Sequence, residues 1–81
     1  SVLVEVRPAW TQEDAARVLV RHLRAAVPRR YVPTVERARE MMWWDGQFPD
    51  PDECAELASN VHHRHLAHLY PRLTRLCERG E

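Results

Sequence analysis

Apolar residues recur every three to four positions in three stretches of the chain, which is the spacing of a buried helix face. The first stretch follows Thr11, which forms a capping-box pattern with Asp14, and it stops before Pro28, because a residue before proline is disfavoured in a helix. Its apolar positions are Ala15, Ala16, Leu19, Leu23, Ala26 and Val27. The pattern predicts a helix over residues 11–27.

A second, shorter helix is predicted over residues 34–44. Pro33 and Thr34 are both residue types that begin helices, and Gly46 is placed to end this one. The apolar face consists of Val35, Ala38 and Met42. The helix ends in the unusual sequence Met-Met-Trp-Trp.

The strongest local signal is the sequence Asp-Pro-Asp-Glu at residues 50–53. It combines an N-cap aspartate, a proline at the first helical position and a glutamate that reaches back to the cap. The apolar positions that follow at helical spacing are Cys54, Leu57, Ala58, Val61, Leu66, Leu69, Leu73 and Leu76. Pro71 interrupts the backbone hydrogen bonds, but the leucines continue past it. We therefore predict one long helix over residues 51–78, kinked near residue 71.

The length of this helix has a consequence for its surface. A straight helix over residues 51–78 would be about 42 Å long, whereas a compact domain of this size is roughly 30 Å across. The helix must bend at Pro71 or project from the domain, and a projecting apolar stripe needs a partner. The predicted partner-binding stripe consists of Leu69, Leu73 and Leu76.

Valine alternates with other residues over positions 2–7, and Pro8 follows. This pattern is typical of a short extended segment over residues 1–8. Without a second strand to pair with, this segment lies over the helices, frays, or pairs with another chain. The predicted fold is therefore an all-α single domain over residues 1–81, with three helices behind a short N-terminal extended or β segment.

The composition indicates the size, the origin and the cellular location of the protein, but it does not indicate a particular function. A chain of 81 residues buries only about 63% of its extended surface, so association with a partner would add stability. All twelve basic residues are arginine, and lysine and isoleucine are absent, which is typical of a GC-rich coding sequence such as those of actinobacteria and their phages. With neither a run of about 20 apolar residues nor a signal peptide, we expect a cytoplasmic protein without membrane contacts.

Charges are sorted along the chain although the net charge is zero. Residues 15–35 contain five arginines and no acid, whereas residues 40–63 contain six acids and no arginine. The two groups can pair within the fold, steer a partner, or leave the arginines to bind nucleic-acid phosphates. The arginines concerned are Arg17, Arg21, Arg24, Arg29 and Arg30.

The order of extended segment, helix, turn and helix over residues 2–44 resembles that of ribbon-helix-helix DNA-binding proteins, in which strands from two chains pair and enter a groove. The polar positions of this segment are only Glu5 and Arg7, and the Glu5 carboxylate would be repelled by phosphate. The resemblance implies a dimeric DNA-binding regulator, which is the alternative interpretation.

Trp43 and Trp44 are adjacent, so on a helix their side chains point about 100° apart and cannot both enter one core. We expect one indole to pack inside with Met42 and Phe48. The other lies against the third helix or stays exposed as an interface anchor, a role in which tryptophan is enriched. The predicted apolar anchors for a partner are Trp43, Trp44 and Phe48.

Candidate chemistry is sparse. The chain lacks a glycine-rich phosphate loop and a nucleophile elbow, so we expect neither an enzyme nor a cofactor. Cys54 lies near a helix start, which can lower a thiol pKa, but Cys54 and Cys77 are interpreted as packed free thiols.

Four histidines occupy two helical turns, namely His62, His63, His65 and His68. No carboxylate or thiol at helical spacing completes a metal site, so we expect no metal and place the histidines at the edge of the core. Metal binding with ligands from elsewhere and a protonation switch remain alternatives.

Taken together, the sequence predicts a small non-enzymatic protein-interaction module. It self-associates into a homo-oligomer or docks on a larger protein as an accessory or regulatory factor. The aromatic residues and the leucines bind the partner, and the arginines steer and orient it.

Overall fold

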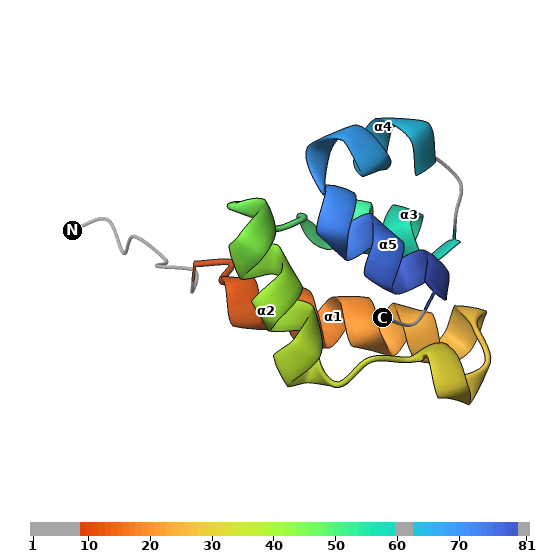
Figure 1. Ribbon diagram of the computed structural model, residues 1–81. Helices are drawn as coiled ribbons and strands as arrows, with labels where there is room; N and C mark the ends of the chain where they lie inside the picture. Colours follow the sequence, from red (N-terminus) through yellow and green to blue (C-terminus); the bar gives the residue numbers. More distant parts are fainter. Residues whose placement is uncertain (1–8, 60–62, 80–81) are drawn as a thin grey trace.

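The computed structural model describes residues 9–59 and 63–79, which are helical apart from short connections (Figure 1). The elements are α1 (Gln12–Ala26), a 3-10 turn η1 (Arg29–Tyr31), α2 (Val35–Asp45), α3 (Pro51–Ser59), α4 (His63–Leu69) and α5 (Pro71–Arg79). This part of the chain contains no strand, so the all-α class is confirmed. The extended segment expected over residues 1–8 lies outside the described residues.

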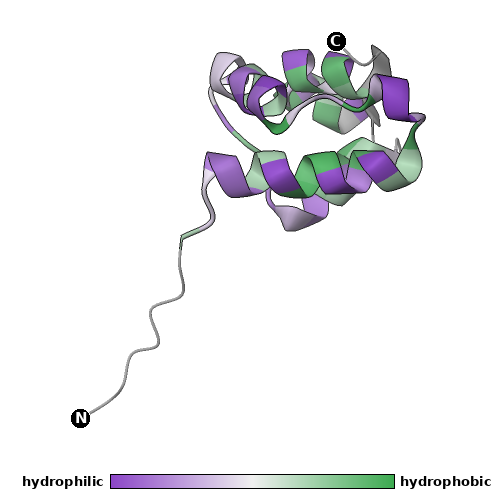
Figure 2. Ribbon diagram, turned by 90° about the horizontal axis from the view of Figure 1, so that it is seen from below, coloured by the Kyte–Doolittle hydropathy of each residue, from purple (hydrophilic) through white to green (hydrophobic). Residues whose placement is uncertain are grey.

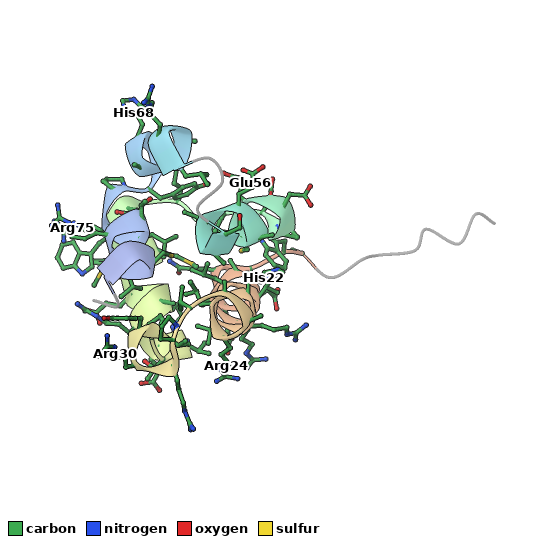
Figure 3. All side chains as sticks on the ribbon, turned by 90° about the vertical axis from the view of Figure 1, so that its right-hand side faces the viewer. His22, Arg24, Arg30, Glu56, His68 and Arg75 are labelled. Carbon is green, nitrogen blue, oxygen red and sulfur yellow. The ribbon has the colours of Figure 1, made fainter. Side chains whose placement is uncertain are left out.

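The core lies where the helices α1 to α5 pack against one another. α1 packs against α2 and α3, and α5 packs against α2 and α4. Hydrophobic and hydrophilic residues are interspersed along the helices (Figure 2). The charged side chains of Arg24, Arg30 and Arg75 point away from the core (Figure 3). The buried apolar residues are Ala15, Ala16, Leu19, Val20, Leu23, Ala38, Met42, Cys54, Leu57, Ala58, Leu66, Tyr70, Leu73, Leu76 and Cys77.

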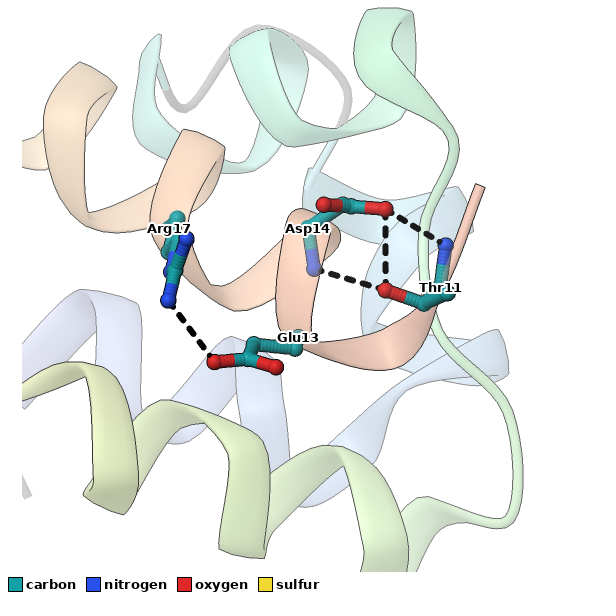
Figure 4. A network of polar contacts seen from close by, with 4 residues as sticks. All are labelled: Thr11, Glu13, Asp14 and Arg17. Atoms are coloured by element: carbon teal, nitrogen blue, oxygen red, sulfur yellow. Dashed lines mark hydrogen bonds and ion pairs between the residues drawn. The ribbon is translucent and has the colours of Figure 1, made fainter. Parts of the chain in front are cut away.

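The predicted capping box fixes the start of α1 (Figure 4). The Thr11 hydroxyl accepts a hydrogen bond from the backbone N–H of Asp14 at 3.1 Å, and the Asp14 carboxylate accepts one from the backbone N–H of Thr11 at 3.0 Å. These hydrogen bonds, led by the one from the Thr11 backbone, lower the pKa of Asp14. At the other end, α1 stops before Pro28 as expected.

The limits of α2 and the start of α3 also follow their local signals. The Thr34 hydroxyl accepts from the backbone N–H of Arg37 at 3.1 Å. Gly46 ends α2 with a φ of 75°, in the left-handed region that favours glycine. Asp50 caps α3 by accepting from the backbone N–H of Glu53 at 2.8 Å.

The prediction of one long helix over residues 51–78 is wrong, because this range contains α3, α4 and α5. Pro71 does not kink a continuous helix but begins α5, since a proline at the first helical position needs no hydrogen-bond donor. The chain turns at Tyr70, so that α5 folds back beside α4 and onto α2 (Figure 1). The leucines beyond the turn are thereby covered by the chain itself.

The N-terminus of α5 is capped by a residue from another helix. The carboxylate of Asp45, the last residue of α2, accepts hydrogen bonds from the backbone N–H groups of Arg72 at 3.1 Å and Leu73 at 2.8 Å. The negative charge also lies at the positive end of the α5 dipole. Asp45 therefore fixes the C-terminal end of α2 against the start of α5.

The loop after α2 is held in place from two sides. The indole N–H of Trp10 donates to the backbone carbonyl of Pro49 at 2.9 Å. The side-chain amide of Gln47 donates to the backbone carbonyl of Leu69 at 2.7 Å. These hydrogen bonds tie the loop to the segment before α1 and to the end of α4.

Candidate interaction surface

Large aromatic side chains are exposed at the C-terminal end of α2 and in the loop that follows. Trp43 is 66% exposed, Trp44 52% and Phe48 37%. We call these three residues the aromatic surface. The expectation that one indole packs inside is wrong: the buried face of α2 is formed by Ala38 and Met42, four residues apart, and neither tryptophan falls on that face.

The two indoles contact each other and an arginine. The ring centres of Trp43 and Trp44 are 5.0 Å apart, and their planes are inclined by 79° in an edge-to-face arrangement. The guanidinium carbon of Arg72 lies 4.8 Å from the centre of the Trp44 ring, which is a cation–π contact. Because Asp45 caps the backbone at Arg72, the cap that joins α2 to α5 also positions this arginine.

Charged residues of both signs border the aromatic surface. Trp43 lines a depression of about 400 Å³ together with Gln12, Glu36, Arg39 and Glu40. Glu40 pairs with Arg37 at 3.1 Å, and Arg72 lies on the side of Trp44. The border thus has charges of both signs beside Trp43 and a guanidinium beside Trp44.

The predicted leucine stripe is not a surface. Leu73 is fully buried and Leu76 nearly so, while Leu69 at the end of α4 is partly buried against the core. The physical reason is the turn at Tyr70, which directs the apolar face of α5 toward α2 and α4.

The five arginines of residues 15–35 form no ion pair with the acidic stretch of residues 40–63 in the described part of the chain. Arg17 pairs with Glu13 within α1 at 2.8 Å (Figure 4), and Arg30 stacks over the Tyr31 ring at 4.6 Å. The remaining arginines of this group form no ion pair with any described residue, namely Arg21, Arg24 and Arg29. Intramolecular pairing therefore does not account for the sorted charges.

Cys54 is buried, and its sulfur lies 3.6 Å from the backbone carbonyl oxygen of Ala15. Burial raises the pKa of the Cys54 thiol to about 12, and the negative charges of Asp50 and Glu53 add to this effect. A lowered pKa at the start of α3 is therefore excluded, and the thiol stays protonated at neutral pH. Cys77 is buried as well.

Tyr70 is a second buried acid. Its hydroxyl donates to the Glu53 carboxylate at 3.1 Å. Burial raises the pKa of Tyr70, and the hydrogen bond to Glu53 raises it further. Both acids therefore prefer their neutral forms in the folded protein.

The stability of the protein should fall in alkaline solution. The folded pKa of Cys54 exceeds its ordinary value of 9.0, and that of Tyr70 exceeds 10.0. The neutral forms of these two side chains contribute their full stabilisation of the folded state below pH 9.0. This contribution is lost as the pH rises toward their pKa values in the folded protein, because the same groups ionise at lower pH in the unfolded chain. Urea unfolding at a series of pH values checks this, with Cys54→Ala expected to weaken the dependence. A free energy of unfolding that stays constant above pH 10.0 would contradict it.

The histidine cluster is only partly described. His62 and the side chains of His63 and His65 lie outside the described residues, and His68 is exposed (Figure 3). Among the described residues, no group of three or more histidine, cysteine, aspartate or glutamate side chains is arranged to hold a metal ion.

Comparisons with known proteins found no relative of this chain. No family model matches it, and no curated protein and no solved structure matches it. Within the described ranges, none of the helices has the length and apolar character needed to cross a membrane. The function is therefore inferred from the surfaces that the fold exposes.

Proposed function

We propose that the chain is a non-enzymatic protein-interaction module that associates with a second copy of itself through the aromatic surface. The observation that carries the proposal is the exposure of both neighbouring indoles, each more than half accessible to solvent. Tryptophan and arginine are the residues most enriched at the energetic centres of interfaces. Here Trp44 and Arg72 are already stacked on each other.

A second copy fits the charges around this surface. In a two-fold dimer the same patch meets itself, so a group on one side of the patch faces a group on the other side in the partner. Glu36, beside Trp43, can then face Arg72, beside Trp44 of the other copy. The zero net charge removes overall repulsion between copies.

Replacing Trp44 by Ala is expected to weaken dimerisation at least about thirtyfold, because a central indole contributes roughly 2 kcal/mol or more to an interface. Light scattering across micromolar to submillimolar concentrations should show a dimer for the native chain and a shift toward monomer for the variant. The helical circular dichroism should be unchanged, because the side chain is largely exposed.

His68→Gln, at an exposed position on α4, is the matched control and should dimerise normally. A native chain that stays monomeric at all concentrations would overturn self-association, and a larger protein would then be the partner to seek for the same surface. A Trp44→Ala variant that loses its helical structure would show that the indole is needed for folding.

The second candidate function is a dimeric DNA-binding regulator that places the arginines of α1 and η1 on phosphates. The observation that favours it is that Arg21, Arg24 and Arg29 have no ion-pair partner among the described residues. Binding to duplex DNA that weakens steeply with salt would distinguish this function from the first.

A further inference from the structure

A depression of about 520 Å³ opens between the end of α1 and the segment that leads through η1 into α2. Its lining residues are Arg24, Arg29, Val32, Pro33 and Thr34. The volume falls in the range of small-ligand sites, roughly 300–1,000 Å³. This depression is separate from the aromatic surface, with which it shares no residue.

The charge in the depression is positive and unneutralised. Arg24 and Arg29 are exposed, and neither forms an ion pair with a described residue. Arg30 lies at the same end of the molecule as Arg24 (Figure 3). Two planar guanidinium groups beside one depression offer forked donors that match the oxygens of an anion.

The remaining lining residues indicate which chemical group is attached to the anion. The Thr34 hydroxyl accepts from the backbone N–H of Arg37 at 3.1 Å, which leaves its own proton to donate to a ligand. Val32 and Pro33 form an apolar wall, and Val32 packs against the core from this segment. The depression therefore offers three donor groups next to a surface suited to an organic substituent.

We propose that this depression binds a phosphate monoester whose ester group is small and apolar or aromatic. Near neutral pH such a phosphate carries a charge of about −1.5 to −2 and three terminal oxygens, which match two guanidinium groups and one hydroxyl. A phosphate diester, as in a nucleic-acid backbone, has one charge and two terminal oxygens and leaves part of this donor set unused. The apolar wall distinguishes an ester from free phosphate.

The test is a titration of the ¹⁵N-labelled 81-residue chain with phenyl phosphate, inorganic phosphate and dimethyl phosphate, followed by NMR. Phenyl phosphate should shift the amide signals of Val32 and Thr34 and bind most tightly, inorganic phosphate less tightly, and dimethyl phosphate least. Binding should weaken below about pH 6, where the phosphate takes up a proton.

Arg24→Gln and Arg29→Gln should each weaken phenyl phosphate binding about tenfold, the effect of losing one charged hydrogen-bonding group. Arg75→Gln removes an exposed arginine away from the depression and should leave binding unchanged (Figure 3).

Three results would overturn the proposal as a whole, and a fourth would overturn one part of it. The first is the absence of shifts at Val32 and Thr34 with millimolar phenyl phosphate, and the second is an equal loss of binding in Arg75→Gln. The third is dimethyl phosphate or duplex DNA binding as tightly as phenyl phosphate, which would assign the arginines to nucleic acid. Inorganic phosphate binding as tightly as phenyl phosphate would overturn the assignment of the apolar wall to an ester group.

Discussion

Replacing Leu73 by Ala is expected to lower the free energy of unfolding by about 2–5 kcal/mol, the usual effect of truncating a fully buried leucine. Leu73 has no exposed surface and lies on α5, where that helix packs against α2 and α4. A domain of this size has a free energy of unfolding of only about 5–15 kcal/mol or less. The Leu73 side chain alone therefore accounts for a large share of the free energy of unfolding.

Urea unfolding followed by circular dichroism measures this loss, and Leu69→Ala is the matched control. The chemical change is the same, but Leu69 at the end of α4 is only partly buried, so its loss should be clearly smaller. If Leu73→Ala were as stable as the native chain, α5 would present its leucines to solvent or to a partner, as the sequence alone suggested.

Replacing Asp45 by Ala is expected to destabilise the protein by about 1–3 kcal/mol, because two backbone N–H groups at the start of α5 lose a charged acceptor. These donors belong to Arg72 and Leu73. Loosening the start of α5 should also disturb the stacking of Arg72 on Trp44, which near-ultraviolet circular dichroism of the indoles detects.

Asp52→Ala is the control for Asp45→Ala. Asp52 is an exposed acidic residue in the first turn of α3, so it shares the favourable position at a helix N-terminus. It does not, however, bridge two helices. Its replacement should cost only a few tenths of a kcal/mol. Equal losses in the two variants would show that the connection between α2 and α5 adds nothing to stability.

The features predicted correctly from the sequence are those decided within four or five residues. Thr11 and Asp50 cap their helices, and Gly46 ends α2. Each depends on backbone groups close by, so the residue type and its spacing suffice. The Asp45 cap has no such local signal, because its two donors lie 27 and 28 residues further along the chain.

The course of the chain after α3 could not be predicted for a related reason. A periodic row of leucines has the same pattern whether it faces its own core or another molecule, so the pattern alone does not show that Leu73 is buried. Pro71 was equally ambiguous, because proline both kinks a helix and begins one. Only the packing of α5 on α2 and α4 decides between these cases.

The candidate sites were predicted in part. Residue type singles out Trp43, Trp44 and Phe48 as anchors, but the same reasoning places one indole in the core, whereas all three side chains are exposed. The sorted charges also single out Arg24 and Arg29, within a group of five arginines, for steering a partner or binding phosphate. The sequence does not indicate the depression that these two arginines line, because that shape arises only when the chain returns through η1 toward the start of α2.

The burial of both native cysteines makes the protein easy to label at a chosen position. A maleimide reacts with an exposed thiolate, and Cys54 is shielded, with its pKa raised to about 12 by that burial. A single thiol introduced at an exposed site such as Ala25 in α1 would therefore react first. A dye attached there would follow assembly without removal of the native thiols from the core.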